Sequence, residues 1–178
     1  MDKRSVLNIH KTVLSLLKDG KNRKILDLGC GNGDLSNDLY KLGFDVIACD
    51  AYLSDIRKKH PHIKCKFADL NKDFPFDNNE FDYAVALELI EHLENPWYFF
   101  REVNRVVKPR GKFILTTPNI ENYWSRLVYF LVGKFPLFTK VHETTDTLSI
   151  DKGHISLVPL WLIKKMVRET QFEIEKTT

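Results

Sequence analysis

Residues 24–36, KILDLGCGNGDLS, decide the fold of this chain. The run KILDL has the short apolar character of a buried strand, and DLS opens a segment with helical periodicity. Between the two stand Gly29, Gly31 and Gly33, which let the backbone turn tightly and approach a bound ligand closely. The stretch therefore predicts a strand, a ligand-binding glycine loop and a helix in succession.

The same alternation of strand and helix continues outward from this stretch. We predict strands over 24–29, 45–50, 64–70, 81–88 and 111–119, and helices over 6–17, 34–42, 54–60, 97–107, 123–132 and 159–171. Alternating strands and helices form right-handed βαβ crossovers and a parallel sheet covered on both faces. The prediction is a doubly wound α/β fold, whose ligands bind at the carboxyl ends of the strands.

Length and composition indicate one domain, since the chain has 178 residues and 43% of them are hydrophobic. We divide residues 1–178 into a leading helix, a cofactor-binding core, an acceptor or lid region, and a closing helix and strand, which span 1–20, 24–119, 120–158 and 159–178. Three scattered cysteines fit neither a disulfide framework nor a zinc ribbon, so we interpret them as reduced core residues.

Charge and hydropathy exclude other classes. A net charge of +3 from 27 basic and 24 acidic side chains lacks the excess typical of nucleic-acid binders. The most apolar stretch, 127–138, is interrupted by glycine, lysine and proline and is shorter than the ~20 residues that span a bilayer. The N-terminus lacks a signal-peptide pattern, so we expect a cytoplasmic protein without a transmembrane segment.

The spacing of the glycines indicates the kind of ligand. It is GxGxG, and Asp34 takes the place of the last glycine in the dinucleotide pattern GxGxxG. A carboxylate at a helix N-terminus would repel a pyrophosphate seated there, which disfavours an NAD-linked dehydrogenase. The absence of GK[ST] argues against ATP or GTP. S-adenosylmethionine fits, because it carries an adenosine and a cationic sulfonium but no phosphate.

Two further carboxylates end successive predicted strands. Asp50 is placed to accept hydrogen bonds from both ribose hydroxyls, and Asp69 to accept from an adenine amino group. Either could instead be a solvated strand-end carboxylate or a helix cap. Their joint occurrence at neighbouring strand ends favours the binding interpretation.

At this point the chain resembles the class I methyltransferases. The matching motifs are ILDLGCGNGDLS (25–36), VIACD (46–50), FADLNKDFPFDNNEFDYAVALELIEHLENP (67–96) and REVNRVVKPRGKFILTTPN (101–119). The resemblance implies a sheet ordered 3-2-1-4-5-7-6 with strand seven antiparallel. It also implies S-adenosylmethionine as cofactor. Its methionine end would be held by Asp27, Gly29 and Gly31, its ribose by Asp50, and its adenine by Asp69 and Leu70.

The C-terminus departs from that pattern. Residues 172–178, FEIEKTT, can supply strand six, but nothing remains for strand seven. Either the chain is cut short or a partner completes the sheet edge, so a homodimer is one expectation.

Acceptor chemistry is expected just after the fourth strand. Glu88 is predicted to bind the cofactor beside the expected sulfonium. A helical turn there would put Glu91 and His92 on the same face as Glu88. His92 is the first candidate for a general base, His154 the second and Glu91 the third. Similar residues hold a divalent ion in small-RNA 2′-O-methyltransferases and ubiquinone-biosynthesis O-methyltransferases, with His154 or His142 as a further ligand here. We assign no metal and keep that alternative, while His10 and His60 are interpreted as surface residues.

An aromatic stretch follows the fifth strand, where this family builds its acceptor wall. Its members are Tyr123, Trp124, Tyr129, Phe130, Phe135 and Phe138. They could be ordinary helix core, or they could form an apolar acceptor pocket or a contact with a membrane-borne lipid. The resulting hypothesis is methyl transfer to a hydroxyl of a small or lipophilic acceptor. The alternatives are a catalytically silent S-adenosylmethionine-binding scaffold and a metal-assisted RNA 2′-O-methyltransferase.

Overall fold

A computed structural model describes residues 3–17, 20–135 and 154–177. Along the chain, the helices and strands are α1 (Lys3–Leu16), β1 (Lys24–Leu28), α2 (Asp34–Lys41), β2 (Asp45–Asp50), α3 (Ser54–Lys59), β3 (Lys64–Phe67), β4 (Phe81–Leu87), η1 (Ile90–His92), α4 (Pro96–Val106), β5 (Val107–Thr116), α5 (Tyr123–Val132) and α6 (Leu160–Glu169). The alternation expected from the sequence is therefore present.

The strands form one parallel sheet in the order β3-β2-β1-β4-β5. This order reverses between β1 and β4, so the glycine loop after β1 opens at the switch point where α/β sheets bind ligands. The doubly wound α/β prediction is confirmed over these five strands. Strand β3 is shorter than predicted, and β5 begins earlier, with a register shift between Phe81 and Tyr83 of β4.

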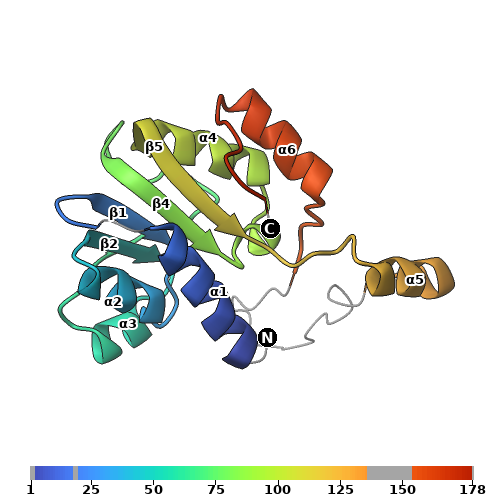
Figure 1. The fold of residues 1–178 in the computed structure, drawn as a ribbon, viewed down its shortest axis with the longest axis horizontal. Coiled ribbons are helices and arrows are strands. Elements are labelled where there is room, and N and C mark those ends of the chain that lie inside the picture. Colours follow the sequence, from blue (N-terminus) through green and yellow to red (C-terminus); the bar gives the residue numbers. More distant parts are fainter. Residues whose placement is uncertain (1–2, 18–19, 136–153, 178) are drawn as a thin grey trace.

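Helices cover both faces of the sheet (Figure 1), and an apolar core lies between the sheet and each layer of helices. Helices α4 and α6 cover one face, where Phe99, Phe100 and Met166 pack against Leu26 and Leu28 of β1. The other face carries α1, α2 and α3, whose buried residues pack against Ile25 of β1 and its neighbours. Successive residues of β1 thus enter opposite cores, because side chains of a strand alternate between its faces.

The prediction that the C-terminal residues supply a sixth strand is wrong, because residues 172–177 form no strand. Their contacts with β5 run through side chains: Phe172 packs on Phe113, and Lys112 Nζ lies 2.8 Å from Glu175 Oε2. The tail is therefore tied to β5 without a backbone ladder. Among the described residues the sheet ends at β5, so its order is 3-2-1-4-5 and not 3-2-1-4-5-7-6.

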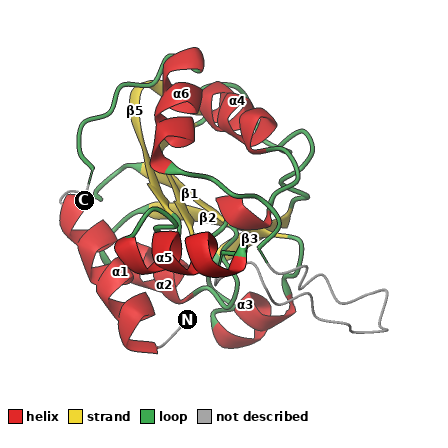
Figure 2. Cartoon of the chain, turned by 90° about the vertical axis from the view of Figure 1, so that its right-hand side faces the viewer, coloured by secondary structure: helices red, strands yellow, loops and turns green. Residues whose placement is uncertain are grey.

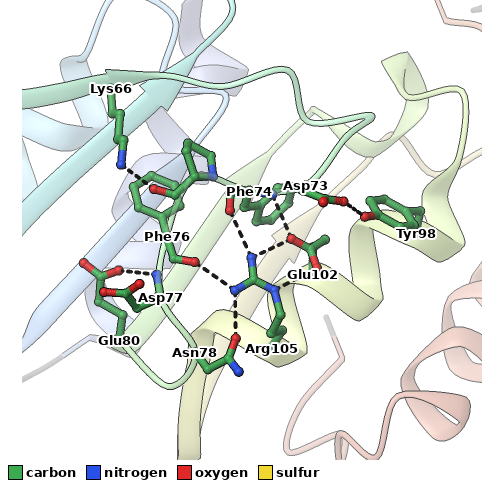
Figure 3. A network of polar contacts seen from close by, with 11 residues as sticks. Lys66, Asp73, Phe74, Phe76, Asp77, Asn78, Glu80, Tyr98, Glu102 and Arg105 are labelled. Atoms are coloured by element: carbon green, nitrogen blue, oxygen red, sulfur yellow. Dashed lines mark hydrogen bonds and ion pairs between the residues drawn. The ribbon is translucent and has the colours of Figure 1, made fainter.

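A polar network fixes the segment between β3 and β4 (Figure 3). Arg105 of α4 donates hydrogen bonds to the backbone carbonyls of Phe74 and Phe76, at 3.0 and 2.8 Å. Its guanidinium also donates to both carboxylate oxygens of Glu102, one of which accepts from Phe74 N at 2.7 Å. This segment directly follows Asp69 and Leu70, so the network anchors the chain beside the predicted adenine site.

Candidate functional site

The glycine loop after β1 has the left-handed backbone that its sequence predicts. Gly29, Gly31 and Gly33 have φ values of 72°, 52° and 80°, where residues other than glycine are strained. A Cβ atom on Gly29 or Gly33 would collide with Leu89 or Ile56, whereas one on Gly31 would meet nothing within 4 Å. Gly31 therefore faces open space, as expected for backbone that approaches a ligand.

The amide N–H groups of this loop are already engaged. Gly29 N and Cys30 N donate to Cys49 O, Gly31 N to Asp50 Oδ2, Gly33 N to Cys30 O, and Asp34 N to Asn32 Oδ1. A phosphate bound at a helix N-terminus needs these donors. The side chain of Asp34 adds negative charge at the same place. The loop thus disfavours a pyrophosphate, in agreement with the sequence argument.

A hollow opens in front of the loop, lined by His10, Asp27, Gly29, Cys30, Asn32, Asp34, Leu35 and Leu87. Asp27 lies in β1 with 2% of its surface exposed, and its Oδ2 accepts a 2.5 Å hydrogen bond from Ser36 Oγ of α2. Burial raises the pKa of Asp27 to about 6, although Ser36 acts against the rise and nearby Asp50 adds to it. A cationic group in the hollow would offset the cost of charging this carboxylate.

Asp34 is balanced by the end of α3. Its Oδ1 lies 2.6 Å from Lys59 Nζ and 3.1 Å from His60 Nε2. The pKa of Asp34 is lowered, because these hydrogen bonds outweigh the opposing effect of burial, the largest single contribution. The His60 side chain is only 12% exposed, so the interpretation of His60 as a surface residue is wrong; its ring pairs with Asp34 at the start of α2.

Asp50 and Asp69 lie at or just beyond the ends of the strands that lead to them. Asp50 ends β2 and accepts from Gly31 N at 2.9 Å and Tyr52 N at 3.0 Å, so it joins the glycine loop to the next connection. Asp69 is in the loop after β3, where an ion pair of 3.0 Å with Lys72 is the main cause that lowers its pKa. The neighbouring Leu70 is buried in the core. Their assignment to ribose and adenine stays a prediction.

Glu88 does not share a helical face with Glu91 and His92, so that prediction is wrong. Glu88 has a φ of 50° and stands outside η1, a single 3₁₀ turn. Thr116 Oγ1 donates to Glu88 Oε1 at 2.9 Å, and Glu88 N donates to Thr116 O at 3.1 Å. The Glu88 carboxylate is therefore held against β5 by Thr116, while burial, and to a lesser extent the charge of Glu88, raises the pKa of Glu91 in the turn.

The structure brings Glu91, His92 and His154 together, as the sequence analysis proposed. Their ligand atoms lie within 4.8 Å of one another, and the rings of His92 and His154 meet edge to face with centroids 4.9 Å apart. The Glu91 carboxyl is 2% exposed; its Oε2 accepts from Thr117 Oγ1 at 3.0 Å, and its Oε1 lies 4.0 Å from His154 Nε2. Burial raises the pKa of Glu91.

Backbone bonds bring the distant histidine to this turn. Ile155 N and Ser156 N donate to Glu91 O at 2.9 and 3.0 Å, and Ser156 Oγ donates to Leu93 O. The described residues just before α6 therefore fold back over the turn after β4. Residues 136–153 lie outside the described part, and so do the candidates His142 and Phe138.

Helix α5 is exposed on nearly all sides among the described residues. Tyr123, Trp124 and Phe130 have exposed fractions of 91%, 67% and 84%, and only Ser125 of the helix is buried. Figure 1 shows α5 reaching out from the sheet and its covering helices. In the view turned by 90° α5 lies in front of the lower part of the molecule (Figure 2). Leu160 N, at the start of α6, donates a hydrogen bond of 2.8 Å to Glu121 Oε2 in the connection before α5. The helix-core interpretation of these aromatic residues does not hold.

Sequence reasoning missed four residues of the site. Ser36, Thr116 and Thr117 hydrogen-bond to Asp27, Glu88 and Glu91, respectively. Hydroxyl residues carry no periodic signal, although Thr116 and Thr117 could have been noticed at the carboxyl end of β5. The fourth, His10, was interpreted as a surface residue, yet it lines the hollow.

Comparisons with known proteins agree with this geometry. A family model described as "Methyltransferase domain" matches residues 3–177. The ubiquinone biosynthesis O-methyltransferase of Pelagibacter ubique is 30% identical over 120 residues, which cover 64% of this chain and 48% of the relative. This chain thus spans about half the length of the curated relatives that it matches.

Solved structures share the fold. An S-adenosylmethionine-dependent methyltransferase from Mesorhizobium loti has a TM-score of 0.56 and 23% identity, over 61% of this chain and 53% of that one. The [4+2]-cyclase SpnF has a TM-score of 0.66 and 17% identity, over 95% of this chain and 57% of that one. At such identities the likeness concerns the fold, which a cyclase and a methyltransferase have in common.

Proposed function

Because the chain belongs to the class I S-adenosylmethionine-dependent methyltransferases, we propose that it transfers a methyl group from this cofactor to a hydroxyl of a small, lipophilic acceptor. The observation that carries the proposal is the cluster of Glu91, His92 and His154 beside the glycine loop. Leu89, which precedes η1, occupies the space where Gly29 lacks a side chain, so the loop and the cluster are neighbours.

Three features of the hollow and the glycine loop support S-adenosylmethionine as the ligand. Gly31 presents open backbone, Asp27 offers a buried carboxylate, and the loop disfavours phosphate. When bound, the cofactor supplies a methyl group activated by a positively charged sulfur. The protein then has to orient the acceptor and exclude water.

The acceptor hydroxyl must lose its proton, and we assign that step to His92. Glu91 faces His154, and the ring of His154 packs edge to face against His92. In this arrangement Glu91 and His154 act as positioning residues, since the carboxylate steadies one ring, which in turn restricts the other. The proposed acceptor lies against His92 and the exposed aromatic side chains of α5.

The lipophilic nature of the acceptor rests on α5. The helix exposes mainly aromatic and aliphatic side chains; its one charged residue is Arg126, and it contains no acidic residue. The relatives named for ubiquinone biosynthesis suggest a hydroxylated aromatic ring with a long apolar chain as the class to test. No helix of the described part is both long and apolar enough to traverse a bilayer.

A metal-assisted transfer is the second candidate, favoured by the same cluster. Glu91 Oε1 accepts no hydrogen bond from the described residues, and one carboxylate with two imidazoles suits a divalent transition metal. A bound cation there would polarise the acceptor oxygen, with Glu91, His92 and His154 as its ligands. In this version an RNA ribose is an alternative acceptor.

The test uses the full chain with methyl-labelled S-adenosylmethionine and three acceptors. These are a catechol with a long alkyl chain, the same catechol without the chain, and a short RNA duplex. We expect label in the alkylated catechol, less in the bare catechol and none in the RNA. Cofactor binding without transfer to any hydroxyl acceptor would instead indicate the catalytically silent scaffold.

A further inference from the structure

The imidazole ring of His10, in α1, lines the hollow in front of the glycine loop and can form hydrogen bonds there. It lies on α1, is half-buried, and lines the hollow together with Asp27, Gly29 and Asn32. Val13, one turn further along α1, is 2% exposed and packs in the same core as Leu35 of α2. Residues three apart share a helix face, so the packing of Val13 directs His10 toward the hollow.

The lining of the hollow contains two carboxylates, those of Asp27 and Asp34, and neither lysine nor arginine among the residues that the structure describes. Asp34 is already paired with Lys59 and His60, so Asp27 is the carboxylate left to meet a cationic group. The amino-acid end of the cofactor carries both an ammonium and a carboxylate group. Asp27 suits the ammonium, because burial disfavours its charge and a cation beside it would offset that cost. The cofactor's own carboxylate needs a donor elsewhere.

The glycine loop is a poor source of that donor. Of the six backbone N–H groups of residues 29–34, five are engaged in bonds within the protein, as described above. An anion could displace them only at the cost of breaking the loop's own hydrogen bonds. Among the lining side chains, His10 and Asn32 are the two strong donors available to a carboxylate, and Asn32 Oδ1 already holds Asp34 N.

We infer that His10 donates a hydrogen bond to the carboxylate of the cofactor's amino-acid end, so that α1 closes the methionine side of the site. This inference rests on the proposed function, since it takes S-adenosylmethionine as the ligand. It assigns to α1 a binding role in addition to its role of covering the core.

Two ligands separate this role from a general effect on the fold. S-adenosylhomocysteine keeps the amino-acid end, whereas 5′-methylthioadenosine lacks both its ammonium and its carboxylate. Calorimetry on the full chain should show that His10→Ala weakens S-adenosylhomocysteine binding roughly tenfold or more, the effect of losing a hydrogen bond to a charged group. The affinity for 5′-methylthioadenosine should stay within about twofold.

Matched variants complete the test. Lys11→Ala, at an exposed neighbour on α1, should change neither affinity. His10→Gln should retain most of the affinity for S-adenosylhomocysteine, because its amide can donate. Equal losses for both ligands in His10→Ala, or equal losses in His10→Ala and His10→Gln, would overturn the hydrogen bond.

The remaining outcomes distinguish the inference from the function on which it rests. An unchanged affinity in His10→Ala together with a loss in Asn32→Ala would move the role to Asn32 and refute the inference alone. If the unmodified chain binds neither ligand, the proposed function fails, and the inference fails with it.

Discussion

Replacing Asp27 with asparagine should remove a loss of stability that the unmodified chain undergoes as the pH rises from acid to neutral. In the folded protein, burial raises the pKa of Asp27 from 3.8 to about 6. Between these values the folded chain keeps a proton on Asp27 that the unfolded chain has released, so stability falls as the pH rises through this window. The gap of about two pH units corresponds to about 3 kcal/mol. An asparagine side chain at this position cannot ionise, so the variant escapes this loss.

Urea unfolding of both proteins between about pH 4 and pH 8 measures the effect. The free energy of unfolding of Asp27→Asn minus that of the unmodified chain should increase by about 3 kcal/mol from pH 4 to pH 7 and then stay level. Other carboxyl groups, whose lowered pKa values destabilise both proteins in acid, cancel in this difference. A difference that does not vary with pH would refute the argument that Asp27 is buried without a compensating cation.

Asp50→Ala should weaken S-adenosylmethionine binding by roughly 1.5–3 kcal/mol, measured by calorimetry. NADH should not compete with the cofactor, and an unchanged affinity in the variant would remove Asp50 from the ribose site. His92→Ala should lower turnover by roughly 10²–10⁴-fold if His92 is the general base, and chelators should then have no effect. If a metal assists instead, chelation should abolish transfer and leave cofactor affinity nearly intact, whereas full turnover in His92→Ala contradicts both versions. Joint replacement of Trp124 and Phe130 by serine should raise KM for an alkylated acceptor more than for a bare one; equal changes would place the apolar pocket elsewhere. Among the described residues no strand pairs with the outer edge of β5, which predicts a homodimer; sedimentation would exclude it by showing a monomer at all concentrations.

Much of the cofactor side could be predicted from local sequence. The apolar run of β1 followed by Gly29, Gly31 and Gly33 defines a strand and a loop with left-handed backbone, and both are observed. Asp50 and Asp69 were predicted as binding residues because the carboxyl ends of parallel strands share one edge of a sheet. These features depend on neighbours in sequence and on the geometry of βαβ units, which periodicity reveals.

The sequence by itself predicted the five strands that the parallel sheet contains, the glycine loop and the residue types at the strand ends. Only the tertiary structure decided that His154 contacts Glu91 while Glu88 turns to Thr116, and that α5 stays exposed. It also decided that residues 172–177 add no strand and that His10 lines the hollow in front of the glycine loop. Such pairings depend on how segments far apart in the chain pack together, and hydrophobic periodicity records only that a side chain is buried, not which partner buries it.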